Sequence, residues 1–143
     1  MIKRLLVPML FCVSACAGSQ NPDDDSIQKI LPLGDSITEG VPYSYRYPLF
    51  SQLSAEGVSV DFVGSHTAGA EVYPDGWDLD HEGHSGWMTV SIEEELPTWL
   101  PQYEVDIALI HLGTNDAGED DVEGSAAAMT GIVEQLRART THG

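Results

Sequence analysis

Short apolar runs alternate with segments of helical periodicity along this chain. Residues 30–33 and 58–64 are apolar or β-branched and predict two strands. The nearly uninterrupted apolar run at residues 105–112 predicts a third strand, buried on both faces. Helical patterns occupy three segments between and after these strands, residues 48–56, 89–100 and 122–139. Strands that alternate with helices predict an α/β fold, with a parallel sheet covered by helices on both faces.

Proline and glycine mark the ends of these predicted helices. Pro48 stands at the start of the first helix and Gly57 directly after its end. Pro97 makes the last turn of the second helix doubtful, because proline cannot donate the backbone hydrogen bond that a helix interior needs. The apolar stripes that we expect in the core are Ile92, Leu96, Trp99 and Leu100 in the second helix and Met129, Ile132, Val133 and Leu136 in the third.

A long polar segment, residues 65–86, separates the second predicted strand from the second helix. We expect it to be a loop, and a loop of this length in a compact domain usually carries function or is disordered. Its His-Glu-Gly-His run at 81–84 lacks the i, i+4 spacing of a helical zinc motif, and Asp75, Asp78 and Asp80 do not match a calcium-binding EF-hand loop. We therefore predict no metal and no cofactor, with bound calcium as the main alternative.

The first 20 residues resemble a secretory signal and are read separately from the fold. Lys3 and Arg4 precede an apolar run at residues 5–13 that is too short to span a bilayer, and small residues follow it. Val-Ser-Ala-Cys at 13–16 resembles a bacterial lipobox, in which Cys16 becomes the acylated first residue.

An ordinary Ala-x-Ala cleavage site at residues 15–17 is the alternative to the lipobox. We favour a lipoprotein signal over residues 1–17, followed by a flexible acidic tether over 18–28 and a partial hydrolase-like domain over 29–143. The expected location is the bacterial cell envelope, by a lipid anchor, or the outside of the cell.

Composition and charge limit the partners of the folded part. The chain has 143 residues, enough for one ordinary domain, and both of its cysteines, Cys12 and Cys16, lie in the leader. The folded part therefore has no disulfide and no thiolate metal site. The net charge is −17, and loss of Lys3 and Arg4 leaves four basic and 23 acidic residues, a net charge of −19. Such a chain repels nucleic acid and anionic lipid surfaces but not neutral or cationic substrates.

A serine lies where the first predicted strand ends. Ligands of open α/β sheets collect beyond the carboxyl ends of the strands, so Ser36 is a candidate nucleophile. A structural alternative is a helix-start capping box formed by Ser36 and Glu39. Gly40 and Pro42 interrupt the turns that such a helix would need, which disfavours this alternative.

Three separated blocks of residues, taken in order, carry a family resemblance. They are Gly-Asp-Ser-Ile-Thr at 34–38, His-Ser-Gly-Trp-Met at 84–88 and Gly-Thr-Asn-Asp at 113–116. In this order they resemble the SGNH hydrolases, the GDSL esterase/lipase superfamily, and the run at 80–87 is most similar to the acetylxylan-esterase-like carbohydrate esterase branch. The resemblance covers residues 29–118. It implies a three-layer α/β/α sandwich with a flavodoxin-like parallel sheet and hydrolysis of acyl esters, in the first place acetyl esters of carbohydrates.

The resemblance also implies roles for individual residues. Ser36 would be the nucleophile, and the oxyanion would be held by the backbone N–H groups of Ser36 and Gly86 and by the side-chain amide of Asn115. Glycine lets the backbone approach the substrate, and an asparagine amide is a donor that never ionises. The structural alternatives are a tight turn at Gly86 and an Asx turn or helix cap at Asn115. Predicted substrate contacts are Asp35, His84, Trp87 and Asp116.

The sequence departs from the family at the general base. The family's base is a histidine in a late Asp-x-x-His block, but Arg139 stands three residues before His142, where that block would need aspartate. His84 lacks an evident orienting carboxylate, His111 on the third strand is expected to be a core residue, and His66 has no predicted role. We therefore expect a C-terminally truncated hydrolase with little esterase activity.

Two alternatives to an esterase and one consequence for folding follow. A surface protein could keep the cleft and bind carbohydrate without catalysis, through the aromatic residues Tyr43, Tyr45, Trp77 and Trp87. A non-functional remnant is the other alternative. If the strand that follows the third one in the family is missing, residues 105–112 present an unpaired apolar edge that favours aggregation or capture of a partner. The sequence leaves the oligomeric state open.

Overall fold

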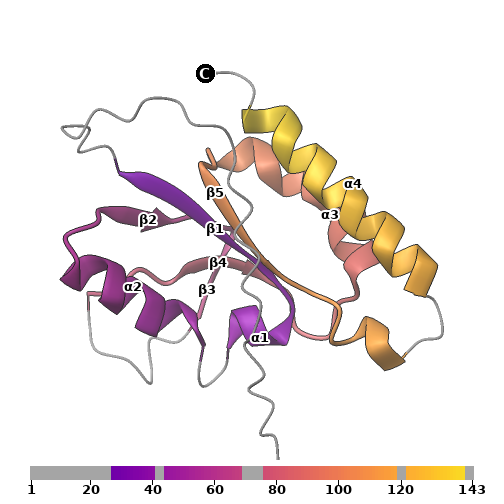
Figure 1. Cartoon of the computed structure of the whole chain (residues 1–143), viewed down its shortest axis with the longest axis horizontal. Coiled ribbons are helices and arrows are strands. Elements are labelled where there is room, and N and C mark those ends of the chain that lie inside the picture. The colour runs from indigo at the N-terminus through magenta and orange to yellow at the C-terminus, as the bar shows by residue number, and fades with distance from the viewer. Residues whose placement is uncertain (1–26, 41–43, 69–75, 119–121, 141–143) are drawn as a thin grey trace, which may run out of the picture.

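The computed structural model describes residues 27–40, 44–68, 76–118 and 122–140 (Figure 1). The predicted signal with Cys16, most of the predicted tether, Tyr43 and His142 lie outside these residues. The helices in these ranges include none that combines the length and the apolar character needed to cross a membrane.

The sheet is built around β1 (Gln28–Gly34), which begins at the last residue of the predicted tether. β1 pairs in parallel with β5 (Ile107–His111) over residues 30–34. Its other edge pairs in parallel with β2 (Val60–Phe62) at the start and with β4 (Asp80–Gly83) at the end. β2, β1 and β5 thus lie in the order of the first three strands of a flavodoxin-like sheet, which confirms the predicted α/β architecture.

β4 and the short β3 (His66–Thr67), antiparallel to it, lie inside the segment that we expected to be a loop. The prediction for residues 65–86 was therefore wrong over these two strands. β4 has no apolar residue, yet His81, Glu82 and Gly83 are buried. A strand of this composition has no hydrophobic pattern by which a sequence reading can find it.

The helices confirm the three predicted segments and form layers on the two faces of the sheet (Figure 1). α3 (Thr89–Trp99) and α4 (Val122–Thr140) lie side by side on one face, and α2 (Arg46–Ala55) lies on the other. Three short elements connect these parts of the chain, namely α1 (Ser36–Glu39) and the 3₁₀ turns η1 (Leu100–Gln102) and η2 (Asp116–Gly118).

Pro97 does not end α3, which continues to Trp99. Proline has no N–H, so the carbonyl of Glu93, four residues earlier, loses its partner within the helix. The Gln135 side chain of α4 donates a hydrogen bond to this carbonyl at 3.1 Å. The neighbouring helix therefore satisfies the group that the proline leaves open.

The main core lies between β1, α3 and α4. Its buried side chains come from the apolar stripes predicted for the two helices and from the apolar residues of β1. They include Leu31, Leu33, Ile92, Leu96, Trp99, Leu100, Ile132 and Leu136. On the opposite face, Phe50 of α2 packs edge-on against Phe62 of β2, with ring centroids 5.9 Å apart.

β5 is not buried on both faces, contrary to the prediction for residues 105–112. Ile107 is 42% exposed and His111 is exposed, so His111 is not a core residue either. Within the described ranges β5 pairs with β1 alone. With no second strand beside it among these residues, solvent reaches side chains that a central strand would bury.

Candidate active site

Three strands end together at one edge of the sheet. Gly34, the last residue of β1, pairs with Gly83 of β4 on one side and with His111 of β5 on the other. Two backbone hydrogen bonds continue this contact, from the His84 N–H to the Gly34 carbonyl at 2.9 Å and from the Asp35 N–H to the His111 carbonyl at 3.4 Å. The three motif blocks therefore leave the sheet from adjacent strands at one edge.

Ser36 is the exposed first residue of α1, the helix that follows β1. The N-cap of this helix is Asp35, whose Oδ1 accepts a hydrogen bond from the Ile37 N–H at 2.9 Å. The capping box with Ser36 as the cap was therefore the wrong alternative. The helix ends after one turn at Gly40, whose left-handed backbone (φ 62°) suits glycine. The Ser36 hydroxyl therefore does not cap this helix.

Two glycines allow α1 to rest directly on the sheet. A Cβ on Gly83 would lie 2.4 Å from the backbone nitrogen of Glu39. A Cβ on Gly34 would lie 2.4 Å from the His111 carbonyl oxygen and 2.2 Å from Oγ1 of Thr38. Since real Cβ atoms do not approach so closely, these glycines set the height of the serine turn above the sheet.

Gly86 lies in a tight turn that follows β4. The Trp87 N–H donates to the His84 carbonyl at 3.2 Å, and Gly86 has a left-handed backbone with φ of 81°. The structural role that we considered for Gly86 is therefore present. Gly86 is exposed at the edge where α1 begins, so its predicted role as an oxyanion donor stays open.

Asn115 ties the loop after β5 to this turn. Its side-chain amide nitrogen donates to the Trp87 carbonyl at 2.7 Å. An amide carries two hydrogens, so one remains for a further acceptor. The contact between the second and third motif blocks is thus direct, while the predicted role of Asn115 toward an oxyanion stays a prediction.

Asp116 anchors the same loop to both outer helices. Its carboxylate accepts hydrogen bonds from the N–H and hydroxyl of Thr89, at the start of α3, and from the Ser125 hydroxyl of α4. Burial acts to raise the pKa of Asp116, but the hydrogen bonds from Ser125 and Thr89 outweigh it and lower the pKa. These contacts assign Asp116 to holding the loop, and contact with a substrate remains a prediction.

Asp35 cannot have the substrate contact that we predicted, because it is fully buried at 0% exposure. One carboxylate oxygen caps α1, and the other, Oδ2, is buried without a hydrogen-bond partner among the described residues. Its role in this structure is to fix the start of the serine helix.

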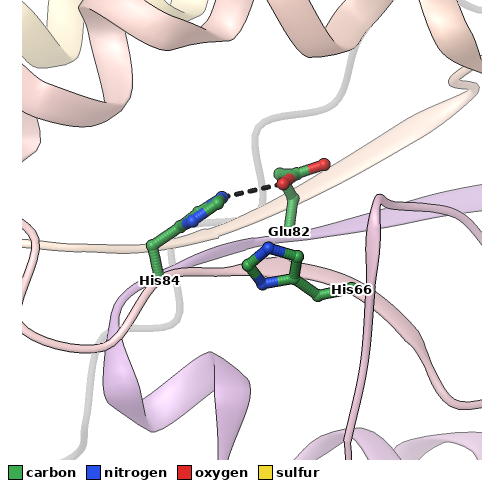
Figure 2. A group of neighbouring side chains, drawn as sticks. All are labelled: His66, Glu82 and His84. Atoms are coloured by element: carbon green, nitrogen blue, oxygen red, sulfur yellow. Dashed lines mark hydrogen bonds and ion pairs between the residues drawn. The ribbon is translucent and has the colours of Figure 1, made fainter.

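His84 does have an orienting carboxylate, which corrects our expectation. Its Nε2 lies 2.7 Å from Oε1 of Glu82, a residue of β4 two positions earlier in the chain (Figure 2). The buried imidazole also stacks on Trp99, with ring centroids 4.2 Å apart, and on Trp87 at 4.6 Å. The sequence did not predict this pair because residues 65–86 were expected to form a loop, and in a loop the spacing i, i+2 does not indicate that two side chains meet.

Glu82, itself fully buried, is the centre of a hydrogen-bond network. Besides His84, its carboxylate accepts from the Ser65 hydroxyl (2.7 Å), the Ser65 N–H (3.0 Å) and the Tyr103 hydroxyl (2.7 Å). Burial acts to raise the pKa of Glu82, but the bonds from His84, Tyr103 and Ser65 together hold it below its usual value. Because an ionised carboxylate only accepts, Nε2 of His84 carries the hydrogen in their bond.

His66 completes a group with Glu82 and His84 whose ligand atoms lie within 4.8 Å of one another (Figure 2). Two histidines and a glutamate are donors that suit zinc. Each oxygen of Glu82, however, already accepts two hydrogen bonds, one of them from Nε2 of His84. A metal ion would have to displace these donors, so the group fits a hydrogen-bonded network and we derive no chemistry through a metal.

An open cleft of about 570 Å³ borders the edge of the sheet. Glu39 of α1 and Ser85, next to Gly86 in the turn after β4, both line this cleft, whereas Ser36 does not. Its lining residues are Glu39, His66, Gly83, His84, Ser85, Trp87, Glu95 and Trp99. The predicted contacts His84 and Trp87 therefore line a cleft next to the serine, and aromatic rings and carboxylates dominate its surface.

Residues 33–142 match the model of the GDSL-like lipase/acylhydrolase family. The chain is 29% identical over 130 residues to a multidomain esterase of Ruminococcus flavefaciens. This match covers 76% of this chain and 17% of that protein. The fold is similar to two solved carbohydrate esterases of family 3. The one from Talaromyces cellulolyticus is 35% identical, with a TM-score of 0.72, and covers 79% of this chain.

The esterase of family 3 from Clostridium thermocellum is also 35% identical, with a TM-score of 0.67, and covers 80% of this chain. The chain spans 57% and 58% of the lengths of these two esterases.

Proposed function

Because this chain belongs to the GDSL-like lipase/acylhydrolase family, we propose that it carries the nucleophile of an acyl esterase. The observation that carries this proposal is the position of Ser36, exposed at the start of α1 directly beyond the end of the central strand. The loops that bear Gly86 and Asn115 leave the two neighbouring strands at the same edge and are joined by the bond from Asn115 to Trp87.

The reaction that this arrangement supports is acyl transfer to serine. Oγ of Ser36 attacks the ester carbonyl carbon, and negative charge develops on the carbonyl oxygen. The N–H groups of Ser36 and Gly86 and the second amide hydrogen of Asn115 are the donors for this oxyanion; each such donor can contribute about 10²–10³ in rate. Collapse of the intermediate breaks the bond to the alkoxy oxygen, which leaves as the alcohol with the proton that the Ser36 hydroxyl gave up, carried by solvent where no base is in place. Water then hydrolyses the acyl-serine, which releases the acid and restores the Ser36 hydroxyl.

No described residue is positioned to act as the general base for Ser36. Among the described residues, no histidine is hydrogen-bonded to the Ser36 hydroxyl, and the Glu82–His84 pair is engaged within its own network. Loss of the histidine from a comparable triad costs about 10⁶ in turnover. We therefore expect the 143-residue chain to be acylated slowly and to turn over little.

Carbohydrate esters, in the first place acetyl esters, are the substrate class that we propose. Two similar structures are carbohydrate esterases of family 3. The cleft beside α1 supports the proposal because Trp87 offers an apolar face for a sugar ring and Glu39 and Glu95 offer acceptors for its hydroxyl groups.

We also propose that the protein is exported and held at the cell envelope by lipid on Cys16. The support is the lipobox-like run at residues 13–16. Metabolic labelling with a fatty acid should mark the wild-type protein and not Cys16→Ser. Labelling of both, or of neither, would contradict the lipid anchor.

The esterase proposal is tested by acylation of Ser36. The chain is incubated with p-nitrophenyl acetate, and intact-protein mass spectrometry follows the gain of one acetyl group. Wild type and Ser51→Ala, which changes an exposed serine of α2, should be acetylated at equal rates, and Ser36→Ala should not be acetylated. Equal labelling of Ser36→Ala would remove Ser36 as the nucleophile.

A second function is favoured by the aromatic cleft together with the absence of a base hydrogen-bonded to Ser36 among the described residues. In this alternative the chain binds carbohydrate without hydrolysing it. Calorimetric binding of an acetylated xylo-oligosaccharide that Trp87→Ala abolishes, together with no acetylation of Ser36, would select it. Acetylation of Ser36 would reject it.

A further inference from the structure

Arg46, the first residue of α2, is fully buried at 0% exposure. Its guanidinium group donates four hydrogen bonds to backbone carbonyl oxygens. The acceptors are those of Thr38 (Nε, 2.9 Å), Glu39 (Nη2, 3.0 Å), Leu79 (Nη1, 2.7 Å) and Ala68 (Nη2, 3.0 Å). A single side chain thus joins α1, the residue before β4 and the residue after β3.

Two of these carbonyls are the last ones of α1. The final carbonyls of a helix have no partner within it, and a helix of one turn is not stable in isolation. Arg46 satisfies the carbonyls of Thr38 and Glu39, and the Ser44 hydroxyl adds a second bond to Thr38 at 3.1 Å. The buried Asp35 caps the opposite end, so α1 is held at both ends by buried charged side chains.

Arginine is specifically suited to this position. Its planar group offers five N–H donors in a fixed fork, whereas lysine offers three donors on one nitrogen. The guanidinium carbon also lies 5.2 Å from the centroid of the Trp77 ring, a cation–π contact on the same side chain. A lysine could not reach four carbonyls that lie on three segments of the chain.

We propose that Arg46 is a positioning residue for the nucleophile. By holding the end of α1 against β4, it fixes the direction in which Ser36 leaves the sheet toward the Gly86 turn. It acts through the backbone and touches no reacting atom. The catalytic consequence rests on the proposed esterase function, whereas the ordering of α1 by Arg46 does not.

The test compares Arg46→Lys and Arg46→Ala with the control Arg137→Ala, which removes a positive charge from the exposed end of α4. Hydrogen exchange is followed at the amides of residues 37–40, all of which donate hydrogen bonds within α1 and its cap. Acetylation of Ser36 by p-nitrophenyl acetate is measured as a function of ester concentration. Guanidinium ion is added to Arg46→Ala as a chemical rescue.

We expect exchange of these four amides to be at least about tenfold faster in Arg46→Lys, with the strands of the sheet unchanged, because charge-assisted hydrogen bonds are lost. The maximal acetylation rate should fall at an unchanged half-saturating ester concentration, and guanidinium should restore part of it in Arg46→Ala. Arg137→Ala should behave as wild type.

The proposal is overturned if exchange at residues 37–40 stays at the wild-type level in Arg46→Lys. It is equally overturned if exchange rises to the same extent in β1 and in α1, which would make Arg46 a general structural residue. If Arg46→Ala does not fold, Arg46→Lys decides in the same way. If wild-type Ser36 is never acetylated, the esterase function fails, and the exchange measurement still tests the positioning role.

Discussion

Two sides of this molecule, the layer of α3 and α4 and the edge of the sheet that carries Ser36, are stabilised by different kinds of interaction. The layer of α3 and α4 packs on β1 through aliphatic side chains and Trp99, and these apolar stripes are visible in the sequence. The edge that carries the serine depends instead on buried polar residues, namely Asp35, Arg46, His81, Glu82 and His84. The stability of a hydrophobic core does not depend on pH, whereas that of a group of buried ionisable side chains depends on the protonation of each member.

The largest expected effect is at the centre of the polar network. Glu82→Gln keeps the size of the side chain but replaces an acceptor by a donor that faces Ser65, Tyr103 or His84. Breaking a buried charged network from one side costs about 3–5 kcal/mol of unfolding free energy. Urea unfolding at pH 7 measures this cost, and Glu94→Gln, at an exposed position of α3, should stay within about 0.5 kcal/mol. A loss below about 1 kcal/mol for Glu82→Gln would show that the network does not stabilise the edge.

The network also has a direction in pH. The folded-state pKa of Glu82 lies below the ordinary 4.5, so its contribution to stability is complete above pH 4.5 and is lost as the pH falls through the lowered pKa. This loss is expected in wild type and should be absent in Glu82→Gln.

An equally direct test addresses the apolar side. Ile132 of α4 is fully buried in the core, and Ile132→Ala should reduce the unfolding free energy by about 2–5 kcal/mol through lost burial and a residual cavity. The cost should be the same at pH 5 and pH 7, because the buried side chains of that cluster are apolar and do not titrate. Val122→Ala, at a position that is 73% exposed on the same helix, is the control and should be near neutral. A strongly pH-dependent cost for Ile132→Ala would undo the contrast between the two sides.

The same contrast explains how far the sequence could be read. Residues 89–99 and 122–140 show helical periodicity, and the pattern is reliable there because burial and hydrophobicity coincide. β4 breaks that coincidence, since its buried side chains His81 and Glu82 are polar, and it was expected to be part of a loop. Arg46 was missed for the same reason: nothing in its neighbourhood of the sequence distinguishes a buried arginine from an exposed one.

For the candidate site, the order of the three motif blocks was enough to expect Ser36, Gly86 and Asn115 at one edge of the sheet. The supporting contacts could not be read in the same way. The contact between Glu82 and His84 depends on the strand formed by residues 80–83, which the sequence did not predict. Asp35 was predicted to contact the substrate because its burial, which depends on how α1 packs on the sheet, was not visible in the sequence. Contacts that depend on tertiary burial leave no local pattern in the sequence.

His81 provides the third test, through acid. Burial, followed by the positive charge of Arg46, lowers its pKa from 6.5 to about 3. The unfolded chain therefore binds a proton between pH 6.5 and 3 that the folded chain does not, so stability falls as the pH is lowered through this window. From pH 6.5 to 4.5 the loss should be about 2–3 kcal/mol. Chemical unfolding of wild type and His81→Asn over this range measures it, and the slope should be shallower in the variant. Equal slopes would mean that His81 is not held neutral.

The smallest expected effect is at Asp116, a carboxylate that joins the two sides. Asp116 belongs to the loop of the site, yet it accepts hydrogen bonds from Thr89 of α3 and Ser125 of α4. Asp116→Asn should cost about 1 kcal/mol, the usual value of a helix cap, and Asp61→Asn at an exposed position of β2 should be near neutral. If the contacts of Asp116 with the helices also keep Asn115 in place, the acetylation rate of Ser36 should fall in Asp116→Asn. The fall should be larger than the decrease in the fraction of folded protein that this loss of stability causes. A double-mutant cycle with Ile132→Ala then decides how separate the two sides are. Additive losses mean that the core and the polar edge are independent, and a coupling above about 0.5 kcal/mol means that Asp116 connects them.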